Sequence, residues 1–189
     1  MSLVTKRALV ASLKKQLQKK PLNKVTISDI TDDCGMNRMT FYYHFKDIYD
    51  LVEWACVEDA RQALAGKKTY DTWQEGFLQI LEELLSNKAF IQNVYHSVSR
   101  EQVELYLHKM TYDLVINVIE EKARGMAVRE DDKAFIADFF KYALVGITLD
   151  WIKNDMKEDP RRIVDRLNRT ISGAISAALE RFRTDKPAP

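Results

Sequence analysis

Residues 26–51 decide the fold, and they read Thr-Ile-Ser-Asp-Ile-Thr-Asp-Asp-Cys-Gly-Met-Asn-Arg-Met-Thr-Phe-Tyr-Tyr-His-Phe-Lys-Asp-Ile-Tyr-Asp-Leu. Ile27, Ile30 and Cys34 give a short helix one buried stripe. Gly35 follows at the point where that helix must end in a left-handed turn, and Asn37 can cap a second short helix with its side chain. The pattern therefore predicts helix, three-residue turn, helix, the geometry that presents a recognition helix to the major groove of DNA.

The second of these helices, residues 38–45, is polar and aromatic at the same time. Phe41 and Phe45 are four residues apart and can both face the core. The remaining side chains are then left to point outward or sideways: Arg38, Met39, Thr40, Tyr42, Tyr43 and His44. Exposed aromatic residues reduce solubility unless a surface uses them. Tyrosine hydroxyls and imidazoles suit phosphate contacts, whereas an arginine at a helix start can bind a guanine edge with two hydrogen bonds.

This stretch closely resembles the DNA-binding domain of the TetR family of transcriptional regulators. The residues that carry the resemblance are Thr26, Ile27, Ile30, Cys34, Gly35, Met36, Thr40, Phe41, Tyr42, His44, Phe45, Lys46 and Leu51. The C-terminal region matches more loosely, at 140–151, where Gly146 and Trp151 look like part of the penultimate helix that such proteins use to dimerise. Within the family, residues 37–47 look like the branch that contains the regulators of dihydroxyacetone-kinase operons.

The resemblance implies a role for each matching residue at DNA. Three side chains are expected to contact phosphates: Tyr42, His44 and Lys46. Thr26 is expected to cap the second helix against the backbone. Asn37 is expected to belong to the DNA-binding residues at the start of the recognition helix. Four side chains are expected to face base edges or the adjoining sugar-phosphate: Arg38, Met39, Thr40 and Tyr43. The alternative is packing against a neighbouring helix for Tyr42 and His44, and a plain solvated lysine for Lys46.

Helical periodicity continues through most of the chain, so we predict an all-α fold of about nine helices. Six glycines and four prolines among 189 residues are few for a β-rich sandwich or barrel. We expect a helix-turn-helix DNA-binding domain at 1–47, a helical regulatory and dimerisation domain at 48–184, and a disordered tail at 185–189. Pro21 is expected to close the first helix, and Asp159 with Pro160 to start the last one.

The charges are distributed unevenly although the net charge is only +1. The first 50 residues hold nine Lys and Arg against five Asp and Glu, and the other residues hold twenty against twenty-three. A basic module joined to a slightly acidic body suggests that one end of the protein meets a polyanion. For Lys14, Lys15, Lys19 and Lys20 we expect mostly solvated charge. Lys6 and Arg7 are candidates for a flexible arm that reaches phosphate or the minor groove.

The composition also excludes several classes. No apolar run approaches the roughly 20 residues that cross a bilayer, and the N-terminus has no signal-peptide pattern, so we expect a cytosolic protein that does not bind a membrane. Two cysteines, Cys34 and Cys56, are too few for a disulfide framework or a closed zinc site. No Gly-rich phosphate loop, nucleophile motif or paired-carboxylate pattern is present. We therefore predict no catalytic residues, no metal and no cofactor.

The C-terminal region is rich in aromatic residues, most of which we expect in the core. Some can still line a ligand pocket, and the candidates are Trp73, Phe77, Tyr95, Tyr106, Tyr112 and Trp151. We expect an effector sensed in this region, either a small molecule or, as the narrower resemblance allows, a protein coactivator.

A second surface is expected on the last helix, where a stripe includes Ile163, Leu167, Ala174 and Ala178. Paired with the helix at 139–151, it would build a four-helix interface in a homodimer. The alternative is that this stripe packs only within one chain.

Two other functional classes remain open. One is a helical adaptor whose helix-turn-helix is vestigial, against which the polar and aromatic recognition helix argues. The other is a small helical enzyme or carrier that uses the aromatic body, for which a polar cluster inside a pocket would be needed. The interpretation that the residues favour is a regulator that binds a palindromic double-stranded DNA operator as a homodimer.

Overall fold

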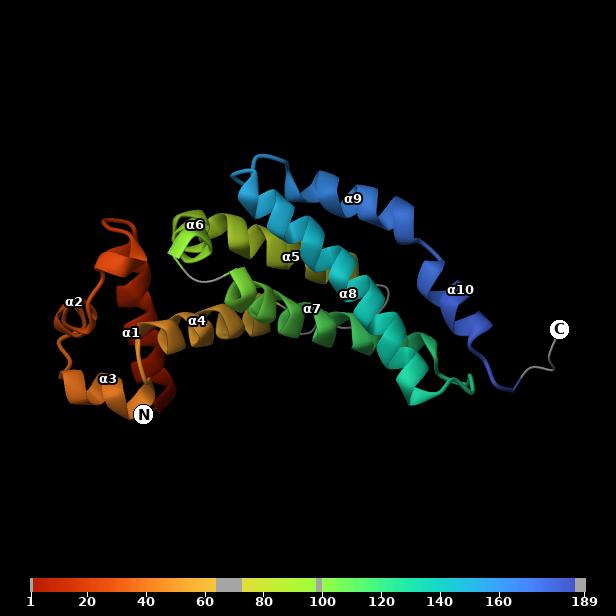
Figure 1. Ribbon diagram of the computed structural model, residues 1–189, viewed down its shortest axis with the longest axis horizontal. Helices are drawn as coiled ribbons and strands as arrows, with labels where there is room; N and C mark the ends of the chain where they lie inside the picture. Colours follow the sequence, from red (N-terminus) through yellow and green to blue (C-terminus); the bar gives the residue numbers. More distant parts are fainter. Residues whose placement is uncertain (1, 64–72, 98–99, 186–189) are drawn as a thin grey trace. The chain divides into compact units, whose positions relative to one another are not determined.

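The structure, a computed structural model, describes residues 2–63, 73–97 and 100–185 of the chain. Over these residues it contains α-helices and one short 3-10 helix, and no strand (Figure 1). The elements are α1 Ser2–Leu17, η1 Leu22–Lys24, α2 Ile27–Asp33, α3 Arg38–His44, α4 Ile48–Ala63, α5 Trp73–Ser86, α6 Lys88–Ser97, α7 Arg100–Lys122, α8 Glu130–Lys153, α9 Pro160–Ile171 and α10 Ala174–Arg181. The predicted all-α fold is confirmed.

The last predicted helix is two helices, α9 and α10. It starts as expected, because the Asp159 carboxylate accepts a hydrogen bond from the backbone N–H of Arg161 at 2.8 Å and Pro160 occupies the first helical position. Gly173 then has a φ of 75°, in the left-handed region that glycine adopts most readily. This break is the reason that the described residues contain ten α-helices where about nine were expected.

The chain forms two compact units. The first unit consists of residues 1–59 and 86–106, and the second of residues 60–85 and 107–189. The first therefore contains α1 to α3 with most of α4 and all of α6, and the second contains α5 and α8 to α10. The predicted division of function between 1–47 and 48–184 stays a prediction, because compactness does not show which residues bind DNA. The predicted tail starts at Asp185, which accepts hydrogen bonds from Arg183, and its other residues lie outside the described part of the chain.

In the first unit, α2 and α3 pack on α1 (Figure 1). Apolar side chains of α1 to α4 are almost completely buried there: Leu9, Leu13, Leu17, Ile30, Phe41, Phe45 and Leu51. Helix α6 lies against the end of α1, where the Asn93 amide donates to the Leu17 carbonyl at 3.0 Å. That contact satisfies one of the carbonyls that a helix C-terminus leaves without an intrahelical partner.

The second unit is a helical layer packed around apolar side chains of α5, α7 and α8. The most buried of them are Phe77, Leu81, Leu114, Ile119, Ala137 and Ile152. Polar contacts join its helices as well, because Gln74 of α5 donates to Asn168 of α9 at 3.0 Å. Lys133 of α8 is nearly buried and pairs with Glu120 of α7 at 2.9 Å. Its contacts with Glu130 and with Glu120 raise the pKa of its ammonium group.

We expect replacement of Gly35 to destabilise the first unit. Gly35 has a φ of +63°, and a Cβ built on it meets nothing within 4 Å, so the cost is conformational rather than steric. Gly35→Ala is expected to lower the free energy of unfolding by about 1–2 kcal/mol, as measured by urea denaturation followed by circular dichroism.

Gly35→Asn is the matched variant, because asparagine tolerates the left-handed region better than alanine. It is expected to lose clearly less stability. Equal losses for the two variants would show that the side chain, and not the backbone conformation, decides the cost.

Candidate nucleic-acid interface

The helix-turn-helix begins with a capping box at Thr26. The backbone N–H of Asp29 donates to Thr26 Oγ1 at 3.1 Å, and the Thr26 backbone N–H donates to Asp29 Oδ2 at 2.7 Å. Lys20, which follows α1, donates to the same carboxylate at 2.7 Å, and these hydrogen bonds hold the pKa of Asp29 well below its usual range. Thr26 therefore fixes the start of α2, as the resemblance implied.

The turn between α2 and α3 has the geometry that the sequence predicted. Gly35 has a left-handed backbone conformation, and the Met36 N–H donates to the carbonyl of Thr31 at 2.8 Å. The Asn37 side chain then accepts from the Met39 N–H at 2.8 Å and caps α3. The start and the orientation of α3 are thus set by hydrogen bonds within the chain.

Helix α3 has a buried face and an exposed face. Phe41 and Phe45 are almost completely buried, with ring centroids 5.8 Å apart. On the opposite side Tyr43 is 84% and Met39 72% exposed, and Tyr42 is exposed by about half. The other side chains predicted to contact DNA are also accessible in whole or in part: Thr26, Asn37, Arg38, Thr40, His44 and Lys46.

Helix α4 is tied to α1 by charged contacts. Arg7 pairs with Glu58 at 2.9 Å, and Lys14 pairs with Asp59 at 2.6 Å. Lys6 lies 5.3 Å from the ring of Phe45 and 5.5 Å from that of Trp54, within the range of a cation–π contact. The expectation of a flexible N-terminal arm is therefore wrong for Lys6 and Arg7, because both lie in α1 and contact the module itself.

The lysines of α1 and of the turn that follows it are partly neutralised by acids of neighbouring helices. Lys15 pairs with Asp33 and Lys20 with Asp29, both on α2. Within the described residues no carboxylate lies in ion-pair distance of Arg38, the first residue of α3, or of Lys46, two residues after its end. The positive charges of Arg38 and Lys46, at α3 and just after it, are therefore not neutralised by these ion pairs.

Comparison with known proteins assigns the family. A model of bacterial regulatory proteins of the tetR family matches residues 6–55, and a model of a transcriptional regulator C-terminal region matches residues 71–173, more than half of the chain. The chain belongs to the TetR family. The resemblance stated from the sequence is thereby confirmed, and the matched families are those of transcriptional regulators.

Individual relatives agree with this assignment. The chain is 25% identical over 149 residues to the HTH-type dhaKLM operon transcriptional activator DhaS of Lactococcus lactis, covering 78% of this chain and 79% of the relative. It is 22% identical to the uncharacterized HTH-type transcriptional regulator YerO of Bacillus subtilis, with 85% of this chain and 62% of that one covered.

Solved structures show the same fold. The dihydroxyacetone kinase operon activator DhaS superposes with a TM-score of 0.72 at 20% identity, covering 96% of this chain and 99% of that one. NalD, the secondary repressor of the MexAB-OprM multidrug efflux pump in Pseudomonas aeruginosa, gives a TM-score of 0.57 at 14% identity, with 98% and 99% covered. The narrower resemblance to regulators of dihydroxyacetone-kinase operons is supported by both comparisons with DhaS.

The aromatic residues predicted to bind a ligand are divided between the two units of this TetR-family protein. Tyr95 and Tyr106 belong to the first unit, and burial raises the pKa of Tyr106 to about 12. The others belong to the second unit: Trp73, Phe77, Tyr112 and Trp151. Phe77 is buried in the core and Tyr112 lies 5.6 Å from the Lys141 ammonium. Their role toward a ligand stays a prediction.

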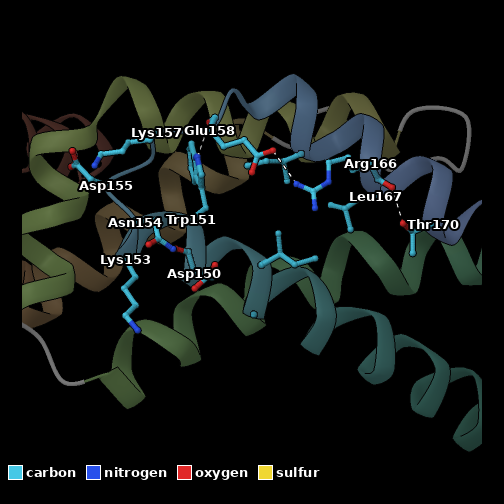
Figure 2. A pocket seen from close by; sticks show the side chains of 13 residues that line it. Asp150, Trp151, Lys153, Asn154, Asp155, Lys157, Glu158, Arg166, Leu167 and Thr170 are labelled. Carbon is cyan, nitrogen blue, oxygen red and sulfur yellow. Dashed lines mark hydrogen bonds and ion pairs between the residues drawn. The ribbon is translucent and has the colours of Figure 1, made fainter.

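Two cavities of the second unit contain residues from this set. Trp73 lines a cavity of about 20 Å³ together with Leu114, Phe140 and Ile175, which is room for about one water molecule. Trp151 lines a different and larger groove of about 830 Å³ between α8 and α9 (Figure 2). Its indole N–H donates to the Glu158 carbonyl at 2.8 Å, which ties α8 to the segment before α9.

The exposed aromatic face of α8 was missed from the sequence. Most aromatic residues were expected in the core, but Phe135, Phe139 and Tyr142 are each more than 60% exposed. They alternate with a second stripe, including Ile136 and Phe140, that is buried. In the sequence, two interleaved apolar stripes form the pattern of one broad apolar face. The pattern therefore does not distinguish the exposed stripe from the buried one.

The stripe predicted for dimerisation on the last helix is partly used within the chain. Ile163 and Leu167 are buried against their own unit, which is the alternative that the sequence left open, whereas Ala174 and Ala178 are half-buried.

Within the described ranges, no group of three or more His, Cys, Asp or Glu side chains is arranged to hold a metal ion. Over the same residues, no helix combines the length and the hydropathy needed to cross a bilayer.

Proposed function

We propose that this TetR-type regulator binds a palindromic DNA operator as a homodimer, through residues 1–47, and is controlled by an effector sensed through residues 48–184. The observation that supports DNA binding is the exposed face of α3. A capped helix presents Met39, Tyr42 and Tyr43 to solvent between two unpaired cations, Arg38 and Lys46. A surface of this composition is costly unless a ligand covers it, and an adaptor with a vestigial module has no need of it.

The side chains divide into two roles by their chemistry. Tyr42, His44 and Lys46 lie toward the end of α3 and carry donors suited to phosphate oxygens. Arg38 and Met39 lie in its first turn, the part of a recognition helix that contacts base edges. The guanidinium of Arg38 can donate two hydrogen bonds to a guanine, and the thioether of Met39 offers an apolar contact to a thymine methyl group.

A homodimer follows from the way such modules read DNA. Two recognition helices related by a two-fold axis match half-sites one helical turn apart, about 10 bp, or a multiple of it. The exposed aromatic face of α8 supplies an apolar surface for the pairing. DhaS is an operon activator by name, and we propose the corresponding role of operon control for this chain.

Effector control needs a route to the recognition helix. Within the first unit, α6 contacts α1 through Asn93 and through Phe90, whose ring lies 5.5 Å from the Lys14 ammonium. Lys14 pairs with Asp59 of α4, so a shift of α6 or α4 acts on the helix that supports α3. The cavity at Trp73 is far below the 300–1,000 Å³ of ordinary ligand pockets. A small effector that binds at Trp73 must open that core, whereas the groove at Trp151, with about 830 Å³, already has the volume of such a pocket. A protein coactivator can act from the surface.

We expect substitutions in α3 to separate phosphate contacts from base contacts. Tyr42→Phe and Lys46→Ala should weaken binding to all duplexes alike, and Lys46→Ala should lower the salt slope by about one for each recognition helix. Arg38→Ala should cost about 1–3 kcal/mol at one base position of each half-site. The measurement is fluorescence anisotropy at several salt concentrations, with an operator selected from a random duplex library.

Tyr49→Phe and Arg124→Ala are the matched controls, because they remove an exposed hydroxyl and an exposed positive charge outside α3. Neither should change operator affinity. Equal losses on operator and random DNA for Arg38→Ala would contradict its assigned role. An absence of salt-dependent binding by the unchanged protein would favour the adaptor with a vestigial module.

Met39 is expected to read a thymine methyl group. Replacing that thymine by deoxyuridine removes only the methyl, so it should weaken the unchanged protein at one or two positions of the half-site. Met39→Ala should bind the two duplexes equally, because the group that senses the methyl is gone. A deoxyuridine effect that persists at every position in Met39→Ala would contradict this contact.

A thermal-shift screen of metabolites is expected to distinguish the two forms of control. A ligand at 100 times its Kd stabilises the protein by about 2.7 kcal/mol, and it must prefer one conformation to change operator binding. A stabilising compound that alters operator affinity supports the small effector. A screen without one, together with a purified partner protein that changes operator affinity, supports the coactivator.

A further inference from the structure

The last two helices of the second unit are joined at a glycine. Helix α9 ends at Ile171 and α10 begins at Ala174, and Gly173 between them has a φ of 75° (Figure 1). A Cβ built on Gly173 meets no described atom within 4 Å, so the backbone conformation and not close packing requires this glycine. Hinges are residues at the ends of elements that absorb a change of φ and ψ, and glycine does so most readily. Gly173 therefore has the properties of a hinge.

Helix α10 forms one wall of the small cavity at Trp73. Ile171, the last residue of α9, and Ile175, in the first turn of α10, both line this cavity, each two residues from Gly173. The remaining lining residues belong to α5, α7 and α8. A rotation of the backbone at Gly173 therefore moves the α10 wall of the cavity and leaves the walls of the longer helices in place.

Helix α10 buries little surface of its own. It has eight residues, too few for a stable isolated helix. It packs on α8, and its buried side chains are Ile175 and Leu179. Helix α8, by contrast, has nine buried residues. Because the stabilisation by apolar burial scales with the area removed from water, α10 is the wall of the cavity that costs less to displace.

The segment after α10 fastens the far end of this helix. The Thr184 backbone N–H donates to the Ala127 carbonyl at 2.8 Å, and the Thr184 hydroxyl donates to the same carbonyl at 3.0 Å. Arg183 donates to the two carboxylate oxygens of Asp185 at 2.9 and 2.8 Å, and to Glu180 at 3.2 Å. Ala127 belongs to the connection between α7 and α8. We call the contact between Thr184 and Ala127 the latch.

The chemistry of the cavity determines which molecules it accepts. All the residues that line it are apolar, and its volume of about 20 Å³ is room for about one water molecule. An uncharged apolar molecule gains free energy by entering such a site, whereas a charged one loses its hydration without finding a partner. A molecule of ordinary ligand size fits only when one wall moves.

We propose that α10 is a hinged lid over a binding site for an uncharged apolar molecule, with its hinge at Gly173 and its latch at Thr184 and Ala127. Opening of the latch moves Ile175 away from Trp73 and admits the molecule to the core of the second unit. This lid rests on the effector control of the proposed function, and it specifies the chemical class of the effector and its way in.

A reversible disulfide across the latch tests the lid. The variant combines Ala127→Cys with Thr184→Cys, because residues joined by a backbone hydrogen bond have Cα atoms within the roughly 4.4–6.8 Å that a disulfide spans. The probe is N-phenyl-1-naphthylamine, an uncharged fluorophore whose emission rises in apolar surroundings. The oxidised double variant should bind this probe at least tenfold more weakly than the same variant after reduction.

The single variants Ala127→Cys and Thr184→Cys are the matched controls, treated with the same oxidant. Neither can close a disulfide across the latch, and the native thiols of Cys34 and Cys56 belong to the first unit. Each single variant should bind the probe equally well before and after oxidation. Equal probe binding by the oxidised and the reduced double variant overturns the lid.

Two further variants test the latch and the site without a disulfide. Thr184→Pro removes both donors of the latch, so association of the probe in stopped-flow fluorescence should be at least fivefold faster, whereas Thr184→Ser keeps both donors and should leave the rate unchanged. Ile175→Phe enlarges the side chain that the lid places in the cavity and should weaken probe binding at least fivefold. Circular dichroism shows whether each variant is folded.

A rate for Thr184→Pro equal to that of the unchanged protein contradicts the latch. Unimpaired probe binding by folded Ile175→Phe contradicts the site. Absence of probe binding by both the unchanged protein and Thr184→Pro overturns the apolar site as a whole.

Operator binding by the same proteins separates this lid from the proposed function. Intact operator binding with equal probe affinity in the oxidised and reduced double variant overturns the lid and leaves the regulator intact. An unchanged protein that binds the probe behind the latch but no operator overturns the proposed function and leaves the lid. A probe that changes operator affinity in the reduced double variant and not in the oxidised one supports both.

Discussion

Burial of Phe41 and Phe45 is the constraint on which the helix-turn-helix depends. These two rings anchor one face of α3 in the core, and Phe45 also contacts Trp54 of α4 at 6.1 Å between ring centroids. Because the helix is short, anchoring one face determines where each of the other side chains points. The exposure of Met39, Tyr42 and Tyr43 is therefore a consequence of packing and needs no contact with DNA to maintain it.

The charged contacts of α1 link the helix-turn-helix to α4. Lys6 contacts the rings of Phe45 and Trp54. Arg7 pairs with Glu58, and Lys14 pairs with Asp59. The Arg7–Glu58 and Lys14–Asp59 pairs are partly buried, and together with the contacts of Lys6 they hold α4 against α1. A displacement of α4 thus reaches the end of α3 through Phe45 and Trp54, which is the route that the proposed effector control uses.

Local signals were sufficient for the module and insufficient for the C-terminal region. The capping side chains of Thr26 and Asn37, and Gly35 in the turn, act within three residues of their own positions, so the sequence pattern predicts them. The contacts of Lys6 and Arg7 involve residues about forty to fifty positions away, and a pattern of basic residues near the N-terminus is equally consistent with a free arm. The separation of the Phe135 and Ile136 stripes on α8 depends on where α7 and α9 pack.

The sequence by itself determined the all-α fold, the helix-turn-helix at residues 26–45 and the side chains that α3 offers, since helix periodicity, caps and turn glycines are properties of neighbouring residues. The tertiary structure alone decided which apolar faces are covered. It buried Ile163 and Leu167, left Phe135, Phe139 and Tyr142 of α8 exposed, and reduced the cavity at Trp73 to about 20 Å³. The physical reason is that burial depends on the position of other helices, whereas local hydrogen bonds and backbone conformation do not.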